Sequence, residues 1–197
     1  MDVFAHVLWT NALFHLKYRR QRRLRYLAAF FGVVPDLIGF APLFIYLIFS
    51  GRFFSGESFP FNSTNWTFGF AERAYDFTHS LVIFTFCFVM VLLIVNLYKY
   101  FKSKQDAVLG KYKFWFFWPM LGWALHILID LPTHPDFYNT PFLFPLSDYK
   151  YTGGVAWSHP TFMAINYGLL IAAYIGIYIY QKKKYGKVVE ENPIEKQ

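Results

Sequence analysis

The stretch FTHSLVIFTFCFVMVLLIVNLYK, residues 77–99, decides the fold class of this chain. From residue 77 to residue 97 it contains no Asp, Glu, Lys or Arg, and about 20 apolar helical residues are enough to cross the core of a bilayer. Tyr98 and Lys99 follow, a pair that is typical of the membrane–water interface. The stretch therefore predicts a transmembrane helix.

Four further apolar stretches lie at residues 3–16, 26–49, 114–131 and 162–180. Across the 197 residues, 56% are hydrophobic and only 16% are charged, whereas about 25% are charged in an average soluble domain. We expect an all-α, polytopic membrane helix bundle with four to five transmembrane helices. Residues 1–184 would form one membrane-embedded domain, and residues 185–197 a polar, disordered tail.

The positive charges of the chain, whose net charge is +7, are gathered in three blocks. Residues 17–25 hold six Lys or Arg, residues 99–113 hold five, and the tail after residue 181 holds five, out of 19 in all. Because the blocks occupy alternate connections between apolar stretches, the positive-inside rule predicts that they are cytoplasmic, the C-terminus included. The loops 50–75 and 132–161 would then face outward. Topology alone accounts for the charge, so we expect no nucleic-acid partner.

The apolar stretch 26–49 contains residues that weaken a helix. Pro35 lacks a backbone N–H donor, and Gly32 has no side chain to favour the helix. Asp36 lies in the same segment, and an isolated carboxylate at mid-bilayer depth would be costly. We therefore expect a helix break within residues 32–42 that delivers Asp36 into an internal polar chamber.

The run GWALHILIDLPTHPDF, residues 122–137, concentrates ionisable groups at the end of an apolar segment. His126 and Asp130 are four residues apart, so a helix presents both on one face, and His134 and Asp136 follow directly. Imidazole together with carboxylate is a ligand set that suits zinc. The other interpretation is a helix-end histidine that only hydrogen-bonds a nearby carboxylate.

Other histidines would meet this pair on the same side of the membrane. His79 opens the stretch 77–97, three residues after Asp76 and on the same helical face, although Asp76 could instead cap the helix. His6 lies near the outer end of the first stretch. Three loop residues remain open between a ligand role and plain solvation: His134, Asp136 and His159.

We expect one or two divalent metal ions, most readily zinc, in an outward-facing polar chamber. The expected ligands are His6, Asp36, His79, His126 and Asp130. A bound ion would lower the pKa of a water molecule to about 7, and Asp76 or Asp136 would orient that water or act as general base. Cys87 is the only cysteine, which excludes a disulfide framework and a cysteine-based metal site.

With these residues laid out, the chain resembles a bacterial and archaeal family of small inner-membrane proteins regarded as metal-dependent hydrolases. That family is distantly similar to zinc-dependent phospholipase C. The resemblance covers roughly residues 1–150 and rests on five elements in order: His6 in FAHVLW, Pro35 and Asp36 in GVVPDLIGF, the tripeptide Thr78, His79 and Ser80, His126 to Asp130 in LGWALHILIDLPTH, and the loop TPFLFPLSDY. It implies an integral protein of a prokaryotic inner membrane that uses a metal ion for hydrolysis.

The location of the site and the resemblance together indicate a hydrolase that acts on an amphiphilic, lipid-like phosphodiester or ester at the outer membrane face, with membrane lipids around it. Two other functions stay open. One is a non-catalytic scaffold or transporter-like protein with a relic metal site, because residues 37–40 lack the further Asp and His that the family often has after Pro-Asp. The other is a redox protein that binds a b-type haem through histidines on two helices.

Single cysteines at positions 55, 103 and 147, introduced as Ser55→Cys, Ser103→Cys and Ser147→Cys in a Cys87→Ala background, test the topology. We expect an impermeant thiol reagent added to intact cells to label positions 55 and 147 but not 103, because the charge bias places residue 103 in the cytoplasm. Labelling is read as a mass shift of the purified protein. Labelling of position 103 from outside would reverse the orientation and the side assigned to the site.

Overall fold

The computed structural model of the protein describes residues 1–54, 66–105, 115–135 and 139–191. Within these ranges the chain forms seven α-helices, two short 3-10 helices and no β-strand, so the expected all-α class is confirmed. In chain order the elements are α1 (Val3–Lys17), α2 (Arg22–Phe31), α3 (Val34–Phe49), η1 (Arg52–Phe54), α4 (Trp66–Thr78), α5 (Leu81–Gln105), η2 (Trp118–Met120), α6 (Leu121–Asp130) and α7 (Pro160–Glu191).

Two helices are each long and apolar enough to cross a membrane, α5 over Leu81–Lys102 and α7 over Pro160–Tyr185. A third candidate is the pair formed by α2 and α3, which meet at a bend of 55°. Helix α1 has 15 residues and α6 has 10, fewer than the about 20 that a bilayer core requires. The described helices therefore supply two to three candidate spans, where we expected four to five, because α1 and α6 are short.

The expected long helix at residues 114–131 is wrong in its extent. Pro119 lies in η2, and the α-helix begins only at Leu121. Proline is compatible with the first turn of a helix but not with its interior, because it lacks the N–H donor and its ring clashes with the preceding turn. The short helix α6 ends at Asp130, whose side chain is buried within the protein.

The expected helix break is confirmed. Helix α2 ends at Phe31, and α3 begins at Val34 with Pro35 in its first turn, where the missing N–H of proline leaves no hydrogen bond unmade. Asp36 also lies in this first turn and is buried. A carboxylate is favoured at this position because the helix dipole is positive there. The break thus turns Asp36 away from the lipid.

The sequence did not predict helix α4, which occupies part of the expected outer loop 50–75. It packs against α3 through the buried side chains Leu43, Leu47, Phe68 and Ala71. Helix α5 then begins at Leu81 and not at residue 77, because Ser80 Oγ accepts hydrogen bonds from the N–H groups of Val82 and Ile83, at 3.1 Å each, and so caps the helix. His79 and Ser80 form the junction between α4 and α5.

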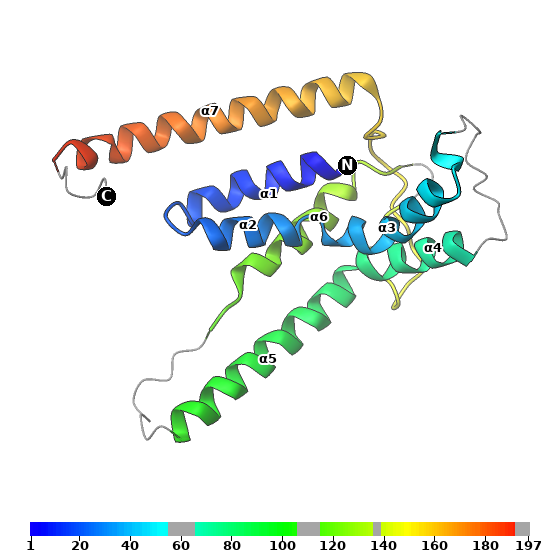
Figure 1. The fold of residues 1–197 in the computed structure, drawn as a ribbon, viewed down its shortest axis with the longest axis horizontal. Helices are drawn as coiled ribbons and strands as arrows, with labels where there is room; N and C mark the ends of the chain where they lie inside the picture. Colours follow the sequence, from blue (N-terminus) through cyan, green and yellow to red (C-terminus); the bar gives the residue numbers. More distant parts are fainter. Residues whose placement is uncertain (55–65, 106–114, 136–138, 192–197) are drawn as a thin grey trace.

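Helix α1 lies between α2 and α7, and α6 crosses beneath them (Figure 1). The contact of α1 with α7 includes a hydrogen bond from Trp9 Nε1 to Asn166 Oδ1 at 2.8 Å and one from Tyr174 Oη to the Leu8 carbonyl at 3.0 Å. Helix α6 packs against α5 around Phe84, Met120 and Ile127. Such hydrogen bonds between helices are favourable in a membrane protein, because a polar side chain that faced lipid would find no water to bond.

The basic ends of the helices share one side of the molecule. The C-terminal ends of α1, α5 and α7 all point to the left in Figure 1, away from α3 and α4. This arrangement is what the positive-inside assignment requires, although which side is cytoplasmic stays a prediction. Helix α7 continues to Glu191, so residues 185–191 are helical where we expected a disordered tail, and residues 192–197 lie outside the described residues.

Glycine allows three helices to meet closely next to the break. A Cβ atom on Gly122 of α6 would lie 2.2 Å from the carbonyl oxygen of Ala28 in α2. A Cβ atom on Gly32 would lie 2.3 Å from Thr10 Oγ1 of α1. Neither position has space for a methyl group, so the close approach of α1, α2 and α6 depends on these two glycines.

Replacing Gly122 by Ala should force α6 away from α2 and lower the free energy of unfolding by about 1–3 kcal/mol, the usual cost of overpacking. Gly176→Ala in α7 is the matched control, because nothing lies within 4 Å of a Cβ atom there. The control should be neutral or slightly stabilising, by up to about 1 kcal/mol. Denaturant unfolding in mixed micelles measures both values, and equal effects at the two positions would contradict the packing described here.

Candidate metal centre

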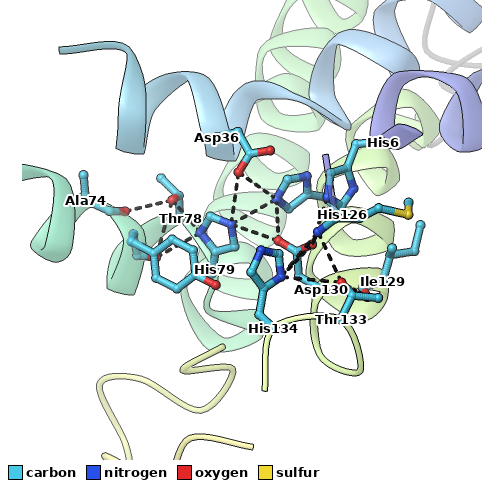
Figure 2. A network of polar contacts seen from close by, with 12 residues as sticks. His6, Asp36, Ala74, Thr78, His79, His126, Ile129, Asp130, Thr133 and His134 are labelled. Carbon is cyan, nitrogen blue, oxygen red and sulfur yellow. Dashed lines mark hydrogen bonds and ion pairs between the residues drawn. The ribbon is translucent and has the colours of Figure 1, made fainter. Parts of the chain in front are cut away.

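Four buried side chains from three parts of the fold converge at the centre of the bundle (Figure 2). Asp36 comes from the first turn of α3, His79 from the junction of α4 and α5, and His126 and Asp130 from α6. Each side chain offers one ligand atom, and these atoms all lie within 4.8 Å of one another. Two imidazoles and two carboxylates at this spacing form a donor set that fits zinc.

The distances within this four-residue cluster are short. The Nε2 atoms of His79 and His126 are 3.0 Å apart. Asp130 Oδ2 lies 3.3 Å from the first and 3.2 Å from the second, and Asp36 Oδ1 lies 3.6 Å from each. The four ligand atoms thus face a common point, although they come from elements that are far apart in the sequence.

Backbone carbonyls fix the orientation of both imidazoles. His126 Nδ1 lies 2.8 Å from the carbonyl oxygen of Gly32, and His79 Nδ1 lies 3.1 Å from that of Tyr75. Because a carbonyl can only accept, each Nδ1 carries the proton and donates. Each Nε2 is then left to face the centre of the cluster with its lone pair, the arrangement that metal-binding histidines have. Gly32 caps the end of α2, where carbonyl groups lack partners within the helix.

The cluster is buried, and Asp36 is the most exposed of its four side chains. His79 and His126 are 0% exposed, Asp130 is 1% exposed and Asp36 is 8% exposed. Asp130 Oδ2 is buried and has no hydrogen-bond partner. Lone pairs on two imidazoles and two carboxylates repel one another unless a positive charge lies among them. A proton or a metal ion can supply the charge.

The second carboxylate oxygen of Asp130 faces a different set of groups. Asp130 Oδ1 lies 2.8 Å from His6 Nε2 and 3.3 Å from His134 Nδ1, and it also contacts the Met1 nitrogen. The ring of His6 stacks on that of His126, with ring centroids 3.8 Å apart. His6 Nδ1 is buried and has no hydrogen-bond partner. Asp130 therefore lies between two groups of nitrogen atoms, one on each oxygen.

The segment after α6 is held by a later part of the chain. The N–H of Val155 donates to the carbonyl of Pro132 at 3.0 Å, and that of Trp157 donates to the carbonyl of Thr133 at 2.9 Å. Gly154 has a φ of +117°, and a Cβ atom there would lie 2.1 Å from the Pro132 oxygen, so the approach requires glycine. These contacts fix the backbone next to His134.

The structure brings together the five predicted ligands His6, Asp36, His79, His126 and Asp130, with His134 beside them (Figure 2). Their role as ligands stays a prediction. The other predicted residues have different surroundings. Asp76 forms an ion pair with Lys150 at 3.3 Å, and neither residue belongs to the cluster. His159 is exposed at the start of α7, and Asp136 lies outside the described residues.

The sequence analysis missed the residues that contact the two imidazoles and fix their orientation. Tyr75 is buried, its ring stacks on His79 with centroids 3.8 Å apart, and its carbonyl orients the same imidazole. Its position four residues before His79, one helical turn away, was a usable signal. No comparable signal links Gly32 to His126, because 94 residues separate them.

No curated protein and no solved structure matches the chain significantly. A family model described as "YdjM inner membrane protein" matches residues 1–190. This description agrees with the apolar helices and with the expected inner-membrane location. Since the match covers nearly the whole sequence, the chain belongs to the YdjM inner membrane protein family.

Proposed function

We propose that this protein is a membrane-embedded, metal-dependent hydrolase. The observation that carries the proposal is the buried convergence of Asp36, His79, His126 and Asp130, whose ligand atoms lie within 4.8 Å of one another. Two buried carboxylates beside two imidazoles with inward-facing lone pairs favour a divalent cation, and the mixed nitrogen and oxygen donor set favours zinc. When bound, zinc supplies a Lewis acid that polarises an ester oxygen and makes water a nucleophile near neutral pH.

The residues of the cluster divide into ligands and a base. His79, His126 and Asp130 are mutually closest, and three protein ligands leave a zinc position open for water. Asp36 is farther away, at 3.6 Å from each imidazole, so its carboxylate is suited to accept a proton from water. This assignment moves the general base from Asp76, which pairs with Lys150, to Asp36.

The second oxygen of Asp130 supports a second ion. His6 and His134 both approach Asp130 Oδ1, and a carboxylate that bridges two cations is the usual centre of a two-metal hydrolytic site. The Met1 nitrogen also contacts Asp130 Oδ1 and lies 3.3 Å from His134 Nδ1, so a second ion would have to displace it. We therefore assign His6 and His134 to the second ion.

The location supports a lipid-like substrate. The elements that carry the cluster, the start of α3, the junction of α4 and α5 and the end of α6, lie away from the C-terminal ends of α1, α5 and α7 (Figure 1), and the helices expose many large apolar side chains. An amphiphilic phosphodiester or ester could reach such a site from the outer leaflet while its chains stay in the membrane.

The two other functions are less well supported. A haem bound by His79 and His126 would have to lie between their Nε2 atoms, which are 3.0 Å apart, and this leaves no space for a porphyrin. Two carboxylates buried beside two imidazoles are costly without a positive charge among them, and a bound metal ion would supply that charge. This favours a site that binds metal over a relic.

Metal content tests the binding site. Detergent-purified protein incubated with Zn²⁺ should contain stoichiometric zinc by elemental mass spectrometry, and His126→Ala and Asp130→Ala should contain almost none while remaining folded by circular dichroism. His159→Ala is the matched control, because this histidine is exposed, and it should keep its zinc. Stoichiometric zinc in both His126→Ala and Asp130→Ala would refute the site, and zinc-free unmutated protein would favour the relic.

Turnover tests the reaction. The zinc-loaded protein should hydrolyse bis(p-nitrophenyl) phosphate or a p-nitrophenyl ester in micelles, measured by release of p-nitrophenolate. Asp36→Asn should retain zinc but lose activity by roughly 10²–10⁴-fold, the usual contribution of a general base. Loss of zinc in Asp36→Asn would make Asp36 a ligand instead, and a zinc-loaded protein inactive on both substrates would contradict the hydrolase.

A further inference from the structure

A buried guanidinium lies at the basic end of the bundle, away from the metal centre. Arg25 in α2 is 8% exposed, and its Nε atom is buried without a hydrogen-bond partner. None of the ion pairs between described residues includes Arg25. Its guanidinium lies 5.3 Å from the centroid of the Tyr26 ring, and an anion beside it would offset the cost of burying the charge.

Two further cationic or donor side chains lie on the segments that precede α2. His15, in the last turn of α1, has a buried Nδ1 atom without a hydrogen-bond partner, and Arg19 and Arg25 are its charged neighbours. The Arg19 guanidinium lies over the ring of Tyr185, 3.8 Å from its centroid, which fixes it next to α7. These donors come from α1, from the connection after it and from α2.

The N-terminal end of helix α2 adds to the positive electrostatic potential in this region. The helix begins at Arg22, its N-cap residue Gln21 forms no side-chain capping hydrogen bond, and its first turn contains no acidic residue. The N-terminus of a helix carries a partial positive charge and free N–H groups, which attract anions.

Aromatic and basic pairs place these side chains at the level of lipid headgroups. Lys17 Nζ lies 2.9 Å from the centroid of a Trp118 ring, and Lys99 Nζ lies 4.7 Å from that of Trp115. Tryptophan and lysine gather in this way at the membrane–water interface. The anion present there at high concentration is the phosphate of an anionic phospholipid.

We propose that Arg25, Arg19 and His15, together with the start of α2, bind the phosphate of one anionic phospholipid in the leaflet on the basic side. This site is separate from the hydrolytic centre and does not depend on it. The guanidinium groups bind phosphate oxygens through charge-assisted hydrogen bonds, and the lipid thereby ties α1 and α2 together and stabilises the bundle.

The test is lipid-dependent thermal stability of the full chain in detergent, with phosphatidylglycerol, phosphatidylcholine or inorganic phosphate added. Phosphatidylglycerol should raise the Tm of the unmutated protein, and the other two should not. Arg25→Gln should weaken the phosphatidylglycerol effect by about tenfold or more in lipid concentration, as expected for loss of a charged hydrogen bond. Arg23→Gln is the matched control, because Arg23 is exposed on the same helix, and it should respond like the unmutated protein.

A second pair keeps the test decisive if Arg25→Gln does not fold. Arg19→Gln should weaken the effect, whereas Arg20→Gln, at an exposed neighbouring position, should not. An equal response to phosphatidylcholine would overturn the proposal, as would an unchanged response in both Arg25→Gln and Arg19→Gln. An equal response to inorganic phosphate would overturn the lipid as the source of the anion.

Discussion

The buried carboxylate of Asp130 is the group on which the arrangement of the bundle depends. A carboxylate removed from water is stable only beside positive charge or hydrogen-bond donors. Its Oδ1 atom contacts His6 of α1, and its Oδ2 atom faces His79 and His126. One side chain thus connects α1, the junction of α4 and α5, and α6. The two imidazoles and the Oδ2 atom face one another at 3.2–3.3 Å, so a proton or a metal ion among them would balance the charge of the carboxylate.

The helix break after Phe31 also helps to bring the polar groups of the cluster together, through the backbone. It ends α2 at Gly32, whose carbonyl then accepts a hydrogen bond from His126 Nδ1, and it turns Asp36 toward the imidazoles. Irregular backbone at membrane depth is tolerated where protein covers it. Here α1 and α6 cover it, and they approach closely because Gly32 and Gly122 have no side chains. The break, the two glycines and the cluster therefore form one unit.

Local patterns predicted those parts of the fold that depend on local chemistry. The run of apolar residues after His79 predicted a span, the glycine and proline near Asp36 predicted the break, and the four-residue spacing predicted that His126 and Asp130 share a face. Helix α4 was missed because Gly69, Glu72 and Arg73 interrupt its apolar pattern. The features that were predicted depend on neighbouring residues or on helical spacing, and both can be recognised directly in the sequence.

Contacts across long sequence separations could not be predicted in the same way. His6 meets Asp130 across 124 positions, and no periodicity connects the two. Asp76 looked equally suited to catalysis, yet it pairs with Lys150 of the loop 132–161, and this contact depends on how that loop packs against α4. The backbone carbonyls of Gly32 and Tyr75 that orient the imidazoles could not be predicted from residue types, because every residue has a carbonyl.

The spread of the cluster along the chain has a consequence for how the protein is made. The cluster and the residues beside it extend from His6, near the start of synthesis, to His134, after two thirds of the chain has been translated. Helices α1 to α5 are therefore made while His6, Asp36 and His79 still lack Asp130. Helix α7 contributes none of these residues. The polar groups of the early helices can thus meet their partner only once α6 has been synthesised.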